Sequence, residues 1–204
     1  MYSVKRLMLL CGCGWGLLAQ SVNDLNSLAL QAHRYAIREQ DAARCAPVPE
    51  LGLYRIVGTS GGAEDALMQN GVDLQQWALE FQVERPFVPP PGRQDCSGPG
   101  RPDDGQQSVT IRCGHGLFTD LAWSPLPVFD CKSMEWAWFT ISLEEAVSRL
   151  RRQGFTRGFT RLTLMRPLYY RYPDECTYVF KCPLDHAYVG ISAETGRMLW
   201  TEAF

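Results

Sequence analysis

The sequence predicts an α+β protein made of two small modules, each with one helix packed on an antiparallel sheet of three to four strands and linked by disulfides. Two observations predict this class. Apolar residues recur with helical spacing in two short stretches, and each stretch is followed by several runs rich in β-forming residues. A helix with one apolar face must bury it, and a sheet that follows in the chain can cover it.

The helix of the second module carries the strongest local signals. Ser142 can accept a hydrogen bond from the amide of Glu145, and Glu145 stands at the position that a capping box requires. The apolar residues up to Leu150 share one helical face, and Gly154 offers a left-handed residue after the last turn. We therefore expect a helix over residues 142–150.

Strand-like runs follow this helix at residues 162–165, 176–182 and 187–192. The last run turns into residues 197–200 through Gly196, which fits the positive-φ position of a short hairpin loop.

This order resembles the PepSY domain family, whose modules end in a hairpin of the type valine-aspartate-x-x-threonine-glycine. Residues 142–150 match the helix of that family, and the hairpin residues that match are Tyr188, Val189, Ile191, Ser192, Thr195 and Gly196. Ser192 stands where the family often has Asp. The resemblance covers residues 142–200, and it implies a secreted or cell-envelope module, often an inhibitory or chaperone-like partner of a peptidase, without catalytic residues.

The first half of the chain repeats the same order of patterns. Asp24 or the residue before it can cap a helix, and strand-like runs follow at residues 53–58, 74–83 and 108–113. We interpret residues 23–118 as a degenerate second copy, with one irregular domain as the alternative. The predicted boundaries are a signal peptide at 1–21, an N-terminal module at 22–120 with a long Pro/Gly loop at 86–105, a connector at 121–141 and a PepSY-like module at 142–204.

The N-terminus has the pattern of an export signal. Lys5 and Arg6 precede the apolar run 7–19, and small residues at Ala19 and Ser21 suit cleavage. The run is shorter than the about 20 residues of a membrane span, so we expect no transmembrane segment. We predict a periplasmic or secreted protein, with lipidation at Cys13 as the less favoured alternative.

Removal of the signal would leave an even number of cysteines, which in an exported chain predicts three disulfides. They are Cys45, Cys96, Cys113, Cys131, Cys176 and Cys182. The pairing stays open, with a preference for Cys96 with Cys113. Cys176 and Cys182 would lie about 20 Å apart on one strand, so each needs a partner elsewhere. We expect no cofactor and no metal, since no Cys-x-x-Cys pair occurs and the histidines are scattered.

A basic run predicts a surface that binds a partner. Residues 146–173 contain seven arginines and no acidic residue, and aromatic residues lie beside them. Such a field steers an acidic partner. We predict that a protein of the cell envelope or the exterior binds here, and export argues against nucleic acid. The predicted partner-binding residues are Arg149, Arg152, Arg157, Arg161, Tyr169, Tyr170 and Arg171.

Two other functions compete with this prediction. We expect no enzyme, because no catalytic set stands at usable spacing, and the alternative is a small secreted hydrolase that uses Ser60, His115 and Asp120. A small-molecule, lipid or glycan-binding envelope protein would instead need an apolar cavity. Trp136, Trp138 and Phe139 would line it.

Overall fold

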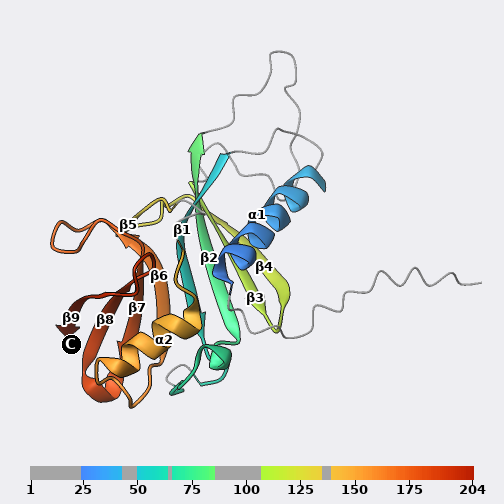
Figure 1. Cartoon of the computed structure of the whole chain (residues 1–204). Helices are drawn as coiled ribbons and strands as arrows, with labels where there is room; N and C mark the ends of the chain where they lie inside the picture. The colour runs from blue at the N-terminus through green and yellow to red at the C-terminus, as the bar shows by residue number, and fades with distance from the viewer. Residues whose placement is uncertain (1–23, 43–49, 64–65, 86–106, 135–138) are drawn as a thin grey trace, which may run out of the picture.

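A computed structural model describes residues 24–42, 50–63, 66–85, 107–134 and 139–204 (Figure 1). The elements are α1 (Leu25–Ala42), β1 (Glu50–Thr59), η1 (Gly71–Asp73), β2 (Gln76–Arg85), β3 (Ser108–Gly114), β4 (Leu117–Ser124), β5 (Cys131–Lys132), α2 (Leu143–Arg152), β6 (Arg161–Pro167), β7 (Thr177–Cys182), η3 (Pro183–Asp185), β8 (Ala187–Ser192) and β9 (Met198–Ala203).

All the strands belong to one antiparallel sheet. Its order is β4-β3-β2-β1-β6-β7-β8-β9, and β5 pairs with the end of β6. The prediction of two helix-on-sheet modules is therefore wrong, because β1 pairs with β2 along one edge and with β6 along the other. Residue patterns show which face of each strand is apolar, but the backbone groups at a strand edge are alike in all residues. The pairing that joins the two sheets into one has no local signature.

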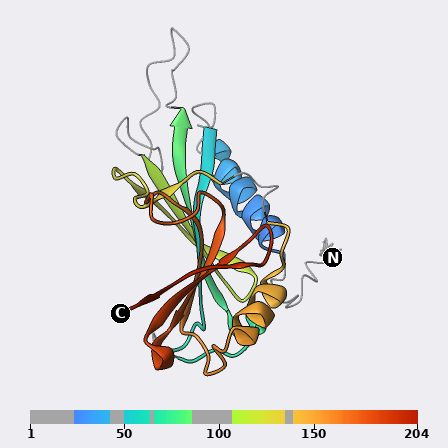
Figure 2. The same ribbon diagram turned by 60° about the vertical axis from the view of Figure 1, so that its left-hand side comes forward.

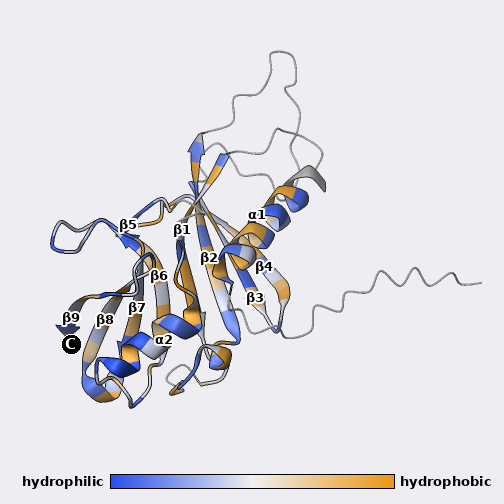
Figure 3. Ribbon diagram, in the orientation of Figure 1, coloured by the Kyte–Doolittle hydropathy of each residue, from blue (hydrophilic) through white to orange (hydrophobic). Residues whose placement is uncertain are grey.

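Both helices lie on the same face of the sheet (Figure 2). Apolar and polar residues alternate along the strands, and the helices turn their apolar side to the sheet (Figure 3). One continuous core results, in which Ala32 of α1, Ile56 of β1, Leu143 of α2 and Tyr178 of β7 all have at most 1% of their surface exposed. Apolar residues from both halves of the chain thus share a single core.

The helices begin where the sequence predicts. Ser142 accepts from the amide of Glu145 at 3.2 Å, which confirms the N-cap of α2, and Gly154 has the expected positive φ of 97°. Glu145 forms an i,i+4 ion pair with Arg149 at 2.8 Å. At α1, the carboxylate of Asp24 accepts from the amide of Ser27 at 3.1 Å.

The connection between β1 and β2 forms hydrogen bonds with the second half of the chain. Met68 and Phe159 exchange two backbone hydrogen bonds, at 2.7 and 3.0 Å. Arg151 of α2 donates to the carbonyl of Gln69 at 2.5 Å, and Leu143 packs so close to Gly71 that an added Cβ would meet its Cγ at 3.0 Å. These contacts hold α2 against the first half of the chain.

The described cysteines correct the disulfide prediction. Cys113, Cys131, Cys176 and Cys182 are buried free thiols. Cys176, just before β7, and Cys182, at the end of β7, are both buried in the core, but neither needs a disulfide partner there, because a buried thiol packs as a small apolar group. The remaining two members of the predicted set, Cys45 and Cys96, lie outside the described residues, and so does Cys13.

The β8–β9 turn keeps the hairpin geometry that the sequence predicts. Gly196 has a φ of 70°, and its amide donates to the carbonyl of Ser192 at 3.0 Å. The Ser192 hydroxyl accepts from the amide of Thr195 at 3.0 Å and donates to the carboxylate of Glu175 at 2.6 Å. The Ser192 hydroxyl thus accepts the backbone hydrogen bond that an Asp side chain accepts in many turns, and Glu175 holds that hydroxyl in place.

Strand β4 crosses residue 120, where the sequence placed the end of the first module, and β5 lies within the stretch expected to be a connector. The segment between them contains Pro125 and Pro127 and has no regular structure. Among the described residues, no helix is long and apolar enough to cross a membrane.

Candidate functional site

Two loops lie side by side at one end of the sheet: the β4–β5 loop and the β6–β7 loop (Figure 1). The backbone carbonyl of Asp130 accepts from the amide of Leu168 at 3.1 Å, and its carboxylate accepts from the hydroxyl of Tyr169 at 2.5 Å. Asp130 also has a φ of 67°, a left-handed conformation that Asp tolerates better than most residues. Asp130 is therefore the link between the two loops.

Side chains of the sheet anchor the β4–β5 loop from below. Ser108 of β3 donates to the carbonyl of Leu126 at 2.6 Å, and Gln82 of β2 accepts from the amide of Val128 at 3.1 Å. Arg55 of β1 donates to the carbonyl of Phe129. Three neighbouring strands thus fix a loop that has no regular hydrogen bonding of its own.

Large apolar side chains stand out from these fixed loops. Phe129 is 58% exposed, Leu168 is 55% exposed, Tyr169 is 49% exposed and Tyr170 is fully exposed. We call these four residues the aromatic patch. Exposed apolar residues that gather on ordered loops are typical of surfaces that bind another molecule.

The charged groups around the aromatic patch are paired with one another. Asp174 contacts Arg166 at 2.6 Å and Lys132 at 2.8 Å, and these two cations, Arg166 foremost, lower the pKa of its carboxyl group. Arg171 lies 3.2 Å from Glu202 and stacks over the ring of Tyr172. Each of these three cations therefore has an acidic partner, although Arg166 and Lys132 share the one carboxylate of Asp174.

Hydrogen bonds at the patch also shift its phenols. The bond from Tyr169 to Asp130 raises the pKa of Tyr169, because ionisation would place two anions together. Burial, followed by the bond to Glu202, raises the pKa of Tyr172, whose ring packs 4.7 Å from that of Trp200. Both phenols therefore act as hydrogen-bond donors at neutral pH.

The predicted partner-binding residues fall into three places. Arg149 and Arg152 belong to α2, on the helix-covered face of the sheet. Arg161 begins β6, and Arg157 lies in the connection before it. Tyr169, Tyr170 and Arg171 lie beyond the other end of β6, about 20 Å from Arg161 at 3.3 Å per residue.

The structure also pairs several of the predicted arginines with acids outside the acid-free run. Arg149 contacts Glu145, Arg157 contacts Asp185 and Arg171 contacts Glu202. The uninterrupted basic field that the sequence suggests is thus divided and partly neutralised in the fold.

Phe129 and Leu168 were not among the predicted site residues. Phe129 lies in the irregular segment that contains Pro127, and Leu168 begins the irregular segment that follows Pro167, the last residue of β6. An apolar residue in such a segment has no strand or helix face to bury it. That combination is the signal that would have indicated them.

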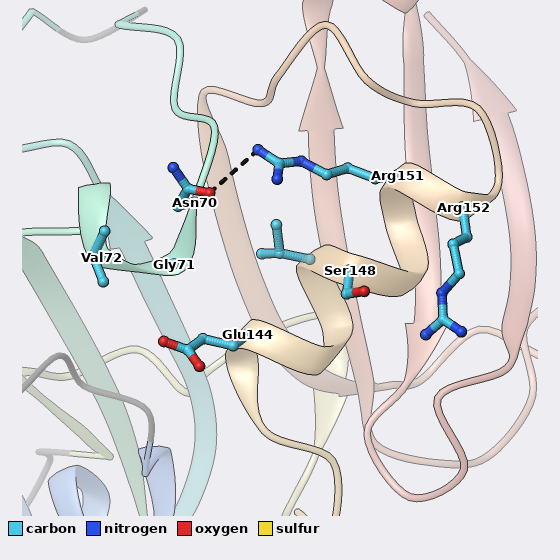
Figure 4. A pocket seen from close by; sticks show the side chains of 8 residues that line it. Asn70, Gly71, Val72, Glu144, Ser148, Arg151 and Arg152 are labelled. Carbon is cyan, nitrogen blue, oxygen red and sulfur yellow. Dashed lines mark hydrogen bonds between the residues drawn. The ribbon is translucent and has the colours of Figure 1, made fainter.

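A shallow groove lies between η1 and α2 (Figure 4). It has a volume of about 580 Å³ and is open to solvent. Arg151 reaches across it and donates to Asn70 at 3.3 Å. Its apolar lining consists of Val72 and Val147, so it lacks the enclosed apolar wall of a typical small-molecule site.

The residues of the hydrolase alternative form no hydrogen-bonded set. Asp120 pairs with Arg112 at 2.6 Å, and the Ser60 hydroxyl accepts from the amide of Gly62 at 3.3 Å. His115 is exposed in the β3–β4 turn, with a φ of 50°. No hydrogen bond joins any two of these three side chains, all of which the structure describes.

The residues of the carrier alternative are only partly described. Phe139 is packed into the core with 8% of its surface exposed, while Trp136 and Trp138 lie outside the described residues. In the part of the chain that the structure describes, no three His, Cys, Asp or Glu side chains come together to hold a metal ion.

Comparisons with known proteins assign no family. No protein-family model matches the chain, and no curated protein matches it. The fold is similar to the crystal structure of a "putative lipoprotein" from Clostridium difficile 630, with a TM-score of 0.48 and 8% identical residues over 87% of this chain and 90% of that chain.

Proposed function

We propose that the protein is an exported, non-catalytic module that binds a protein partner through the aromatic patch. The observation that carries the proposal is the gathering of Phe129, Leu168, Tyr169 and Tyr170, each about half exposed or more, on two loops that Asp130 joins. Export is inferred from the sequence pattern of residues 1–21.

The chemistry of the patch favours a protein over a small molecule. Aromatic residues are enriched in protein interfaces, and tyrosine is among the residues that most often dominate the binding energy. The loops stand out from the end of the sheet, and none of their residues lines the groove between η1 and α2. A partner therefore has to bring its own concave or flat apolar surface to cover them.

Fixation of the loops lowers the cost of binding. A mobile loop loses conformational freedom when a partner orders it, whereas Asp130, Arg55 and Ser108 already hold these loops to each other and to the sheet. The same features support an inhibitor or a chaperone-like partner of a peptidase, the role that the PepSY resemblance implies.

A capture experiment with two matched variants tests the proposal. Tyr170→Ala removes the fully exposed ring of the patch, and Leu117→Ala removes another exposed apolar side chain, 67% exposed, from the opposite end of β4. Envelope fractions of the producing cell are passed over immobilised wild-type protein and both variants, and affinities for each retained protein are measured.

We expect Tyr170→Ala to weaken the specific partner by about 30-fold, the loss of an interface residue worth about 2 kcal/mol. Leu117→Ala is expected to retain it. Equal retention by all three proteins would contradict binding through the aromatic patch.

A further inference from the structure

A second surface, on the face of the sheet that the helices leave open, brings two cations together. Arg161 of β6 and Lys181 of β7 are direct cross-strand partners. Their neighbours Leu162 and Phe180 are fully buried in the core, so Arg161 and Lys181 point to the opposite, open face. Side chains in such a pair stand about 5 Å apart at their Cβ atoms.

Like charges directly opposite one another destabilise a sheet. Elsewhere on this open face the opposite arrangement occurs, as in the cross-strand ion pair of Arg112 with Asp120 at 2.6 Å. Arg161 and Lys181 form no ion pair with any described residue. The folded protein thus keeps the repulsion between Arg161 and Lys181, although an acidic residue at either position would replace it by attraction. Local conflicts of this kind are typical of functional sites.

Aromatic residues border this pair on the side of β8 and β9. The ammonium group of Lys181 lies 5.9 Å from the centre of the Phe204 ring, and that ring packs 4.8 Å from the ring of Tyr188. Tyr188 is itself the cross-strand partner of Lys181, and Phe204 is 53% exposed. A cation is therefore held beside an apolar platform.

We infer that the Arg161–Lys181 pair binds the carboxylate of an acidic segment in the protein partner, with the apolar part of that segment on Tyr188 and Phe204. The inference rests on the proposed function, for which it names the chemistry of the partner. Two adjacent cations without an ion-pair partner attract an anion, and the adjoining rings fit the apolar remainder of a peptide chain better than a bare ion.

The distance between the two surfaces is compatible with one partner. Arg161 begins β6 and the aromatic patch follows its other end, about 20 Å away. A standard interface of about 800 Å² on each partner is roughly 30 Å across. One protein can therefore cover both places.

The free protein provides the first test. Lys181→Glu replaces the repulsive pair by an attractive one, so we expect the melting temperature of the full chain to rise by roughly 1–3 °C. Arg112→Glu makes the reverse change at the paired site and is expected to lower it. An unchanged or lowered melting temperature for Lys181→Glu would show that the pair carries no conflict and would overturn the inference.

Peptide binding provides the second test and needs no knowledge of the partner. The full chain is titrated calorimetrically with a ten-residue peptide in which glutamate alternates with alanine, with the same peptide carrying glutamine, and with inorganic phosphate. We expect binding of the glutamate peptide alone. Arg161→Gln and Lys181→Gln should each weaken it by about tenfold, the loss of one charge-assisted hydrogen bond, while Arg112→Gln should not.

Each other outcome overturns the inference. Equal binding of the glutamine peptide would show that charge is not recognised, equal binding of phosphate would indicate a small-anion site, and an equal loss in Arg112→Gln would indicate diffuse electrostatics. Tyr170→Ala should bind the glutamate peptide normally. A failure of the aromatic patch in the capture experiment therefore remains distinguishable from a failure at the Arg161–Lys181 pair.

Discussion

The cysteines of the core are free thiols, whereas the sequence predicts disulfides for them. Cys113, Cys176 and Cys182 pack among apolar side chains and make no disulfide. Burial raises the pKa of Cys113 to about 11 and the pKa of Cys176 and of Cys182 to about 12, from an ordinary value of 9.0. These groups are therefore neutral and unreactive thiols in the folded protein.

Alkylation checks the state of these thiols. We expect Cys113, Cys131, Cys176 and Cys182 to resist iodoacetamide at pH 8 in the folded protein and to react fully in denaturant, with the sites located by peptide mass analysis. A thiol whose pKa is raised by folding contributes stability that is complete below pH 9.0 and is lost as the pH rises towards 12. Stability should therefore fall over this alkaline range, and a disulfide at any of the four would contradict the prediction.

Among the elements, the strands β8 and β9 pack closely at one point, where a glycine of β8 contacts a tryptophan side chain of β9. Gly190 lies opposite Trp200, and a Cβ at Gly190 would come within 2.3 Å of the indole ring. The Trp200 ring also packs against the ring of Tyr172, with 4.7 Å between the ring centres. The glycine is thus required by packing on the open face of the sheet.

A pair of glycine substitutions measures this packing. Gly190→Ala should displace the Trp200 ring and destabilise the protein by about 1–3 kcal/mol, the usual cost of overpacking. Gly114→Ala in β3 is the matched control, because its Cβ would meet nothing closer than 3.8 Å. Urea unfolding followed by tryptophan fluorescence reports both, and equal effects of the two substitutions would refute the role of Gly190.

In the whole molecule, the two halves of the chain repeat an order of one helix and four strands on either side of the β1–β6 pair. Ile56 lies opposite Leu164 in that pair, and both side chains are buried in the common core. A half separated from the other would expose this strand edge and the apolar face behind it. The halves are therefore parts of one folding unit.

Fragments test this conclusion. Residues 139–204 alone should fail to unfold cooperatively, because β6 would lose β1 and α2 would lose its contact with η1. The full chain should unfold in a single transition in urea, with the same midpoint by circular dichroism and by fluorescence. A cooperative transition in the isolated fragment would show that the halves are independent.

The sequence by itself determined the features that depend on neighbours along the chain. The cap at Ser142 and the left-handed Gly154 and Gly196 follow from residue chemistry at fixed spacing, and the structure confirms them. Such signals are local because helix caps and turns satisfy backbone groups within a few residues.

Only the tertiary structure decided which edges meet. The register that sets Arg161 opposite Lys181, the β1–β6 pair that makes one sheet, and the approach of Asp130 to Tyr169 each join residues that are distant in sequence. Backbone groups at a strand edge are chemically alike, so local patterns cannot select among the possible partners. The selection comes from burying all the apolar faces in one core, and that is a property of the whole chain.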